Sequence, residues 1–122
     1  MNPISWFEVP VTEMERAIKF YNALFDWDLQ VMVAGPITMA WFPSDDTVYG
    51  AGGSLVLNEN YVPSSDGVLV YFQCADVNET IAKVEAAGGK VILEKKLITP
   101  DIGFMGVAID SEGNRIAFHS KQ

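Results

Sequence analysis

The chain has 122 residues, of which 49% are hydrophobic and 20% charged, and its formal net charge is −8. This length suits one domain over residues 1–122 with a core that needs no metal or disulfide for stability. No apolar stretch approaches the roughly 20 residues that span a bilayer, and no signal peptide is expected. The negative charge disfavours nucleic acid and membranes as partners, and the lone Cys74 suits a cytoplasmic protein.

The first half of the chain predicts a strand, a helix and three further strands. The first strand is expected over residues 4–11, and apolar residues recur at helical spacing from Met14 to Phe25. Thr12, followed three residues later by Glu15, predicts a capping box at the start of this helix. Turn residues then separate three short extended segments, at residues 28–34, 37–42 and 53–57.

The second half predicts the same elements in the same order. A strand is expected over residues 68–74, and Asp76 with Glu79 predicts the start of a second helix. Gly88-Gly89 is typical of a helix C-terminus, where glycine adopts the left-handed conformation without strain. The remaining strands are expected at residues 90–97, 104–109 and 115–120.

The two halves read as an internal duplication. The apolar faces of the two predicted helices match at an offset of 63 residues, which pairs Ile18 with Ile81, Tyr21 with Val84 and Leu24 with Ala87. We therefore predict an α+β fold of two βαβββ units in tandem, at residues 4–56 and 67–119. The eight strands are expected to form a mixed sheet curved into a cup, with the helices on its convex side and a cleft between the halves.

Strand alternation predicts which side chains face that cleft. In the first strand Phe7 and Val9 point to one side, toward the helix, so Trp6 and Glu8 point to the other. The matching strand places Leu69, Tyr71 and Gln73 away from its helix. We expect the inside of the cup to carry aromatic and polar groups that form a pocket for a small molecule.

Three motifs together resemble the vicinal oxygen chelate superfamily, which includes glyoxalase I, bleomycin resistance proteins and extradiol dioxygenases. They are Val-Thr-Glu-Met-Glu-Arg-Ala-Ile-Lys-Phe-Tyr at residues 11–21, Gly88-Gly89, and Asp-Ser-Glu-Gly-Asn-Arg at residues 110–115. The resemblance covers nearly the whole chain. It implies a cup of eight strands, a homodimer and, in metal-dependent members, a divalent ion held by His, Gln or Glu from the first and last strands of each unit.

Carried onto this chain, the family's metal positions hold no suitable ligands. The first strands contribute Trp6 and Leu69, the last strand contributes Ala117, and the fourth position falls within residues 53–56, which supply no ligand. A divalent ion needs several N, O or S donors, and the side chains of Trp6, Leu69 and Ala117 offer none. We therefore expect no metal centre of the family type and no cofactor, which disfavours glyoxalase or dioxygenase chemistry by the family's metal-dependent route.

Glu8 and His119 are the remaining candidates for chemistry, because each lies two residues along its strand from a family ligand position. As a pair they would transfer protons or bind a divalent metal at a non-standard site. The alternative is that His119 is solvated near the C-terminus and that Glu8 anchors the end of a sheet or binds polar groups of a ligand. Two donors are few for a catalytic metal, which favours this alternative.

The aromatic residues also allow two interpretations, ligand binding or packing. Trp6, Trp41 and Tyr71 either form a clamp for a flat or apolar ligand or fill the cup and a dimer interface, whereas Trp27 is expected in the core. Gly50 to Gly53 predicts a flexible entry into a strand rather than a phosphate loop. The predicted ligand-binding pocket comprises Trp6, Glu8, Trp41, Leu69, Tyr71, Gln73, Ala117 and His119.

These features favour a metal-free binding protein that holds a small aromatic or amphipathic molecule in the cup, as bleomycin resistance proteins do. The alternative is an enzyme, a lyase or isomerase related to lactoylglutathione lyase, that acts through Glu8 or through a site including His119. A third hypothesis is an interaction module whose sheet surface forms a dimer interface. The expected partners are a small-molecule ligand and a second copy of the chain.

Overall fold

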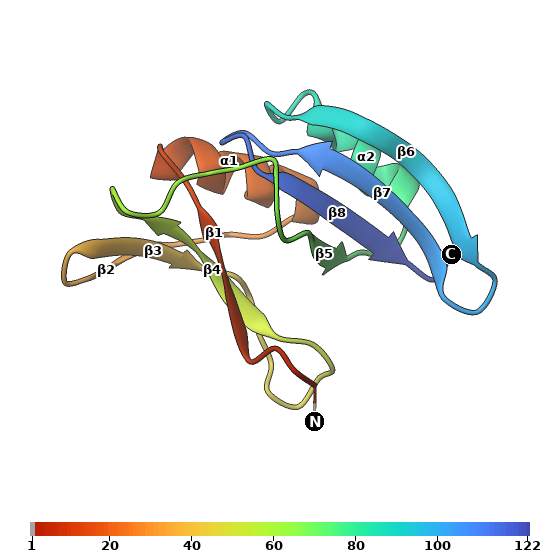
Figure 1. The fold of residues 1–122 in the computed structure, drawn as a ribbon, viewed down its shortest axis with the longest axis horizontal. Coiled ribbons are helices and arrows are strands. Elements are labelled where there is room, and N and C mark those ends of the chain that lie inside the picture. The colour runs from red at the N-terminus through yellow and green to blue at the C-terminus, as the bar shows by residue number, and fades with distance from the viewer. Residues whose placement is uncertain (1) are drawn as a thin grey trace.

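The computed structural model describes residues 2–122, which form two helices and eight strands (Figure 1). A strand, a helix and three strands follow one another twice, as the sequence predicted. Within these residues no helix is long and apolar enough to cross a membrane. The elements are β1 (Trp6–Pro10), α1 (Met14–Phe25), β2 (Val31–Ala34), β3 (Ile37–Trp41), β4 (Gly52–Leu57), β5 (Val70–Gln73), α2 (Val77–Val84), β6 (Lys90–Thr99), β7 (Gly103–Ile109) and β8 (Arg115–Ser120).

The strands form two four-stranded mixed sheets with the same internal order. The first sheet has the order β1-β4-β3-β2 and the second has the order β5-β8-β7-β6. In each sheet the first strand of the unit pairs in parallel with the last, and the remaining pairs are antiparallel. This confirms the predicted α+β fold of tandem βαβββ units. The two sheets are not joined by hydrogen bonds into one closed sheet, and in Figure 1 they form an arch that opens away from the helices.

A single core between the sheets and the helices connects the two halves. Aromatic rings fill its centre, where Phe7 of β1 lies 5.9 Å from Phe72 of β5, measured between ring centroids. Tyr21 of α1 contacts both Phe42 and Phe72, so one helix packs against residues of both sheets. Side-chain packing therefore joins the edge strands β1 and β5 in place of backbone hydrogen bonds, and it also brings α1 against α2.

The start of α1 differs from the prediction. The N-cap is Glu13 rather than Thr12, and its side chain makes no capping hydrogen bond. The backbone N–H groups of Thr12 and Glu13 instead donate to Oε1 of Glu112, each at 2.9 Å. Arg16 adds a hydrogen bond from Nε to the other carboxylate oxygen of Glu112, at 2.8 Å. The predicted capping box is therefore wrong, because a carboxylate from the second half of the chain holds this helix start.

The start of α2 agrees with the sequence, whereas the helix ends at Val84 and a turn at residues 85–88 leads to the predicted glycines. Asp76 is the N-cap and its carboxylate accepts a hydrogen bond from the backbone N–H of Asn78. Gly88 has a φ of +107°, and the N–H of Gly89 donates to the carbonyl of Val84 at 2.9 Å. A hydrogen bond that spans the left-handed residue in this way satisfies one of the last carbonyls of the helix.

Several predicted strands are shorter in the structure, and two of them, β2 and β5, bear on the core and the site. β2 begins at Val31 rather than at residue 28, and Leu29 is buried in the core while its N–H is bound by the side chain of Asn22. β5 begins at Val70, so Leu69 lies just before the strand. Predicted strand positions outside β2 and β5 agree to within about two residues.

Candidate functional site

The sides of the two sheets that face away from the helices form what we call the open face. The core contains Ala40, Leu55, Phe72 and Phe118 and packs against Phe7, so strand alternation places their sequence neighbours on the open face. In the first sheet these residues are Trp6, Glu8, Trp41 and Ser54, and in the second sheet they are Tyr71, Gln73, Ala117 and His119. Leu69 is half-buried beside the start of β5.

Two indoles lie together on the open face of the first sheet. The rings of Trp6 and Trp41 are 5.4 Å apart between centroids and meet edge to face at 71°. Trp6 is 39% exposed and Trp41 is 52% exposed, and Tyr71 on the second sheet is 47% exposed. Trp27 instead stacks on Phe25 at 4.5 Å and packs against the core. The structure therefore places Trp41 on the open face, beside Trp6.

Ser54 is a buried polar residue of the open face that has no hydrogen-bond partner. It lies on β4, in register with Glu8 of β1 on one side and with Trp41 of β3 on the other. Its side chain is fully buried, and its hydroxyl oxygen finds no partner among residues 2–122. Leaving such a group unpaired costs about 1–3 kcal/mol. Residue type alone gave no signal for Ser54, because a serine in a strand is ordinary.

Glu8 and His119 lie on different sheets. Within residues 2–122, Glu8 makes no hydrogen bond or ion pair, and its side chain is exposed. Nε2 of His119 lies 2.6 Å from the backbone carbonyl of Ile102. A carbonyl only accepts hydrogen bonds, so Nε2 carries a proton and, in the neutral imidazole, Nδ1 holds the free lone pair. The structure gives each residue separate neighbours and records no contact between the two.

The donor set at the family's metal positions does not fit a divalent ion. Trp6, Ala117 and Leu69 supply no metal-binding atom, and among residues 53–56 only Ser54 adds a polar side chain on the open face. Among residues 2–122 there is also no group of three or more His, Cys, Asp or Glu side chains arranged to hold a metal. A neutral hydroxyl beside apolar side chains is a poor site for Zn²⁺, Fe²⁺ or Ni²⁺.

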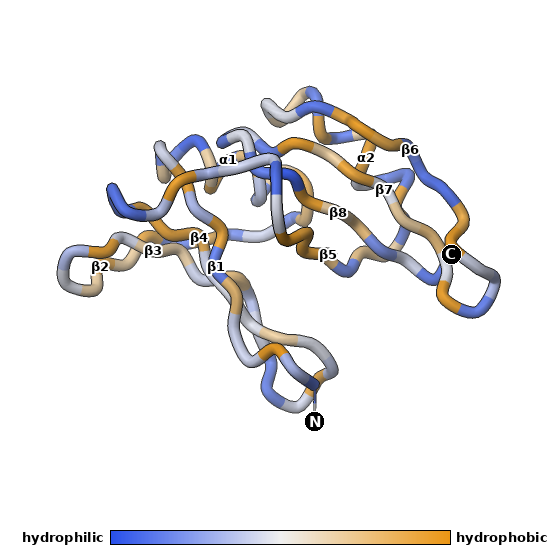
Figure 2. Tube along the Cα trace, viewed as in Figure 1, coloured by the Kyte–Doolittle hydropathy of each residue, from blue (hydrophilic) through white to orange (hydrophobic). Residues whose placement is uncertain are grey.

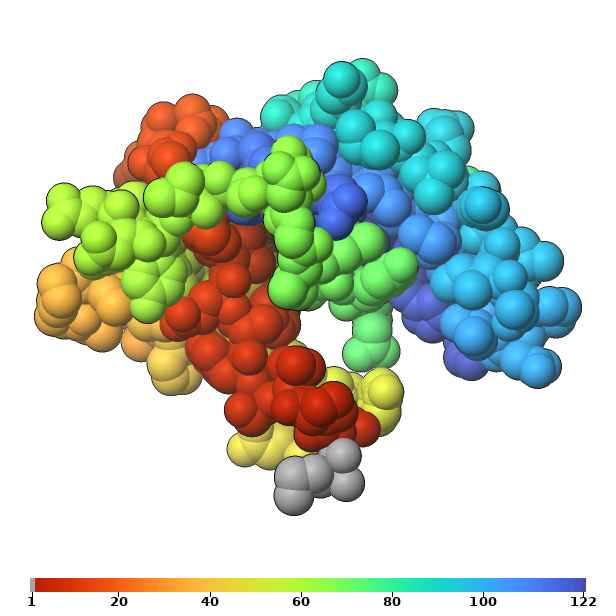
Figure 3. All heavy atoms as spheres, viewed as in Figure 1, coloured from red at the N-terminus to blue at the C-terminus, as the bar shows by residue number. Residues whose placement is uncertain are grey.

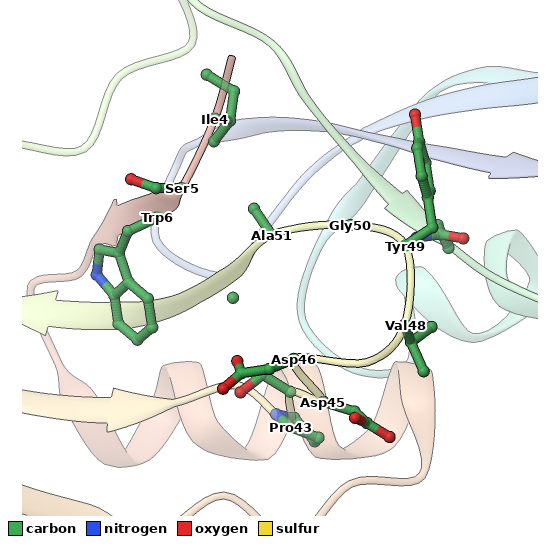
Figure 4. A pocket seen from close by; sticks show the side chains of 13 residues that line it. Ile4, Ser5, Trp6, Pro43, Asp45, Asp46, Val48, Tyr49, Gly50 and Ala51 are labelled. Carbon is green, nitrogen blue, oxygen red and sulfur yellow. The ribbon is translucent and has the colours of Figure 1, made fainter. Parts of the chain in front are cut away.

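A cavity of about 560 Å³ lies beside the open face, between the two halves of the chain. Its walls are the segment before and at the start of β1, the loop between β3 and β4, and one residue of β5 (Figure 4). In Figure 3 an opening separates the red N-terminal segment and the yellow loop from the green β5 segment. The lining residues are Ile4, Ser5, Trp6, Pro43, Ser44, Asp45, Asp46, Val48, Tyr49, Gly50, Ala51, Gly52 and Gln73.

Glycines let the loop between β3 and β4 approach the other sheet closely. A Cβ atom on Gly50 would lie 3.1 Å from Nε2 of Gln73, and Gly50 has a φ of +122° that strains other residues. A Cβ atom on Gly52 would lie 3.1 Å from the ring of Trp6. The predicted flexible strand entry at these glycines is thus also a wall of the cavity.

The cavity brings together some of the predicted pocket residues and leaves others apart. Trp6 and Gln73 line it, whereas Glu8, Trp41, Leu69, Tyr71, Ala117 and His119 lie outside its wall. Sequence reasoning missed Asp45, Asp46 and Tyr49, which line it from the loop. The pair Asp45-Asp46 read as a turn, and only the fold shows that this turn faces β1 and β5.

The loop is held by a local turn that keeps one carboxylate charged. Oδ1 of Asp45 accepts hydrogen bonds from the hydroxyl of Thr47 at 2.6 Å and from its N–H at 2.9 Å. The hydrogen bond from the hydroxyl, and to a smaller extent the one from the N–H, lowers the pKa of Asp45 below its ordinary value. Asp45 therefore stays ionised at neutral pH.

Residues 3–118 match the family model described as "Glyoxalase/Bleomycin resistance protein/Dioxygenase superfamily". The chain belongs to this superfamily. A "Glyoxylase-like domain-containing protein" from Didymella fabae is 32% identical over 114 residues, which cover 91% of this chain and 88% of the relative.

Solved structures of the superfamily share the fold at low sequence identity. Trypanothione-dependent glyoxalase I from Leishmania major superposes with a TM-score of 0.72 at 16% identity, covering 99% of this chain and 88% of that one. A glyoxalase-related enzyme from Fulvimarina pelagi also gives 0.72, at 15% identity over 98% of this chain and 88% of that one. Glyoxalase I from Zea mays gives 0.69 at 18% identity over 98% of this chain, which spans about half (46%) of the maize protein.

Proposed function

We propose that this protein is a metal-free binding protein of the glyoxalase/bleomycin resistance type, which holds a small aromatic or amphipathic molecule in the cleft between its halves. The observation that carries the proposal is the exposed, edge-to-face pair of Trp6 and Trp41 beside a cavity of about 560 Å³. Cavities of roughly 300–1,000 Å³ with aromatic walls suit small organic ligands. An indole pair offers such a ligand a large apolar surface with little loss of side-chain freedom.

The absence of suitable metal ligands supports a binding role. With Trp6 and Ala117 at family ligand positions, the open face holds no set of donors that would polarise a carbonyl or activate oxygen. The aromatic and carboxylate groups that remain bind and orient a molecule without reacting with it. The proposed setting is the cytoplasm, where the unpaired thiol of Cys74 needs no disulfide partner.

A thermal-shift screen tests the proposal with small aromatic, thiol-conjugated and 2-oxo compounds, each with and without divalent metals. We expect at least one aromatic compound to raise the melting temperature without metal, because a ligand that binds only the folded state stabilises it. Trp41→Leu should weaken that binding about 10-fold, equivalent to 1.4 kcal/mol, while Tyr61→Leu in the linker serves as control. No stabilisation by any compound, or equal binding by Trp41→Leu, would contradict the proposal.

Catalysis by Glu8 is the second candidate function. Its carboxylate is exposed and free of protein partners in residues 2–122, so it remains available to a substrate on the open face. A lyase or isomerase related to glyoxalase I would use Glu8 as a general base. Unchanged turnover in Glu8→Gln would exclude that role, and elemental analysis without stoichiometric metal would exclude a metal site at His119.

A homodimer is the proposed assembly. The edge strand β2 exposes Val31, Met32 and Val33, and Figure 2 colours part of its hairpin with β3 orange, the colour of hydrophobic residues. An exposed apolar edge strand favours burial against a second chain. Light scattering that gives the mass of a single chain would refute this assembly.

A further inference from the structure

The cavity between the N-terminal segment and the loop of residues 43–52 has an unusual distribution of charge. Its thirteen lining residues include two carboxylates, Asp45 and Asp46, and no Lys, Arg or His. None of the ion pairs found in residues 2–122 involves either of them, since those pairs join Arg16 to Glu13 and Glu112, and Lys95 to Asp76.

The charge distribution of the whole chain strengthens this local field. Residues 20–82 contain no Lys, Arg or His, although they contain eight Asp or Glu residues. The loop at residues 43–52 and the whole of β2 to β5 fall in this stretch. Six of the eight basic residues follow residue 82, and the other two, Arg16 and Lys19, lie on α1. A cleft lined by one sign of charge concentrates ions of the opposite sign.

The cavity wall also offers aromatic faces. Trp6 lines it at the start of β1, and Tyr49 lines it from the loop with 78% of its surface exposed. Figure 4 shows Trp6 and Tyr49 at opposite ends of the cavity, with Asp45 and Asp46 on the loop between them. Cations bind over the faces of Trp and Tyr rings because the ring quadrupole is negative there.

An inorganic divalent cation such as Ca²⁺ fits this cavity wall less well than an organic ammonium ion does. Ca²⁺ takes six to eight oxygen ligands, and no group of three or more His, Cys, Asp or Glu side chains arranged to hold a metal occurs within residues 2–122. One of the two carboxylates is already engaged, since Oδ1 of Asp45 binds Thr47 twice. An ammonium group needs only a nearby carboxylate and an aromatic face, both of which the cavity provides.

We propose that this cavity binds an organic cation, namely a protonated amine or quaternary ammonium group carried on an apolar or aromatic body. The inference rests on the proposed binding function and specifies its ligand. The ammonium group lies near Asp46 and the face of Trp6, while the apolar body extends toward the exposed indole of Trp41. The side-chain amide of Gln73 closes the β5 side of the cavity. It can donate hydrogen bonds to polar substituents of the ligand or accept hydrogen bonds from them.

Three probes of similar shape and different charge test this proposal. They are benzyltrimethylammonium, neopentylbenzene, in which carbon replaces the charged nitrogen, and benzenesulfonate. Binding is followed by the amide signals of Gly50 and Gly52 and the side-chain amide signals of Gln73 in NMR titrations. We expect the cation to bind about 10-fold more tightly than the neutral probe and the anion to bind more weakly than both. The affinity for the cation should fall as salt increases.

Two variants with the same change of charge locate the site. Asp46→Asn should weaken binding of the cation about 5-fold and leave the neutral probe unaffected, because only the Coulombic attraction is lost. Asp66→Asn in the exposed linker, outside the cavity, should leave both affinities within about 2-fold of the parent protein. Asp45 is a poorer choice for this purpose, since replacing it would also disturb the turn with Thr47.

The outcomes separate this proposal from the proposed function. Equal or tighter binding of the neutral probe would refute the cation as ligand class and leave the binding function standing. Equal effects of Asp46→Asn and Asp66→Asn, or signal changes confined to other residues, would refute the site. Binding of none of the three probes would refute the cation site, whereas the proposed function would be refuted only by the failure of the thermal-shift screen described above.

Discussion

Two regions of this protein treat buried polar groups in opposite ways. In the turn at residues 110–114, which we call the interrepeat turn, the buried carboxylate of Asp110 accepts hydrogen bonds from the hydroxyl of Tyr21 and from Asn114. Glu112 of the same turn holds the start of α1. On the open face, by contrast, the buried hydroxyl of Ser54 has no partner among residues 2–122, and the neighbouring carboxylate of Glu8 is exposed to solvent.

This difference indicates that the polar groups of the interrepeat turn stabilise the fold, whereas those exposed on the open face are left for binding. Polar groups that the protein satisfies itself hold its parts together, and the interrepeat turn connects the second unit to α1 and β1 of the first through Glu112 and Asn114. On the open face, the buried hydroxyl of Ser54 is left unsatisfied and costs stability, whereas the exposed carboxylate of Glu8 is solvated and remains free to meet a ligand. Substitutions in the two regions should therefore change different measurements.

The largest expected effect is on stability, from Asp110→Ala. This change leaves the hydroxyl of Tyr21 and the backbone N–H groups of Glu112 and Asn114 without their acceptor. The side-chain amide of Asn114 keeps only its hydrogen bond to the carbonyl of Pro10. We expect the free energy of unfolding to fall by about 4 kcal/mol, because several buried donors become unsatisfied at once. Urea denaturation measures it.

The control for this change is Asp66→Ala, which removes an exposed carboxylate from the linker and should alter stability by less than about 0.5 kcal/mol. Equal losses in Asp110→Ala and Asp66→Ala would show that the interrepeat turn does not connect the two units. Tyr21→Phe removes one donor alone and should give an intermediate loss of about 1 kcal/mol.

A smaller effect is expected from the titration of Glu112. Burial opposes its ionisation, but hydrogen bonds from Arg16 and from the amides of Glu13 and Thr12 outweigh burial and lower the pKa of Glu112 from 4.5 to about 2. Because the folded protein releases this proton more readily, Glu112 contributes stability above about pH 4.5, and the contribution is lost as the pH falls toward 2. The full loss is at most about 3 kcal/mol.

Unfolding free energies measured from pH 6 to pH 2.5 test this titration. In Glu112→Gln the decline at low pH should be shallower than in the parent protein, whereas Glu59→Gln, an exposed change of the same charge, should leave the decline unaltered. Parallel curves for the parent protein and Glu112→Gln would contradict the role of Glu112 as the acceptor that holds α1.

Local patterns were enough to predict the elements of both units and the family. Helix α2 has its cap residue Asp76 and its terminal glycines within the same segment, so its ends were predictable. Helix α1 has its start held by Glu112, which is about 100 residues away in the chain, and no local pattern indicates such a partner. The capping box at Thr12 was therefore a reasonable prediction that tertiary contacts overturned.

The candidate site was predictable only in part, for the same reason. Strand alternation gave the orientation of Trp6 and Tyr71, because it depends on one strand at a time. The cavity needs the loop of residues 43–52 to meet Gln73 of the other half, and this contact depends on how the two sheets pack. Ser54 gave no signal, since the lack of a partner is a property of the folded chain.

The smallest expected effect compares two buried serines, one from each kind of region. Ser120 accepts a hydrogen bond from the N–H of Val77 and donates one to the carbonyl of Gln122, so Ser120→Ala should lower the free energy of unfolding by about 1 kcal/mol. Ser54 has neither bond within residues 2–122, and Ser54→Ala should raise stability by about 0.5 kcal/mol. Both variants are measured by urea denaturation. A loss in Ser54→Ala as large as that in Ser120→Ala would mean that the Ser54 hydroxyl is satisfied in the free protein, and the open face would then differ from the interrepeat turn only in its exposed indoles.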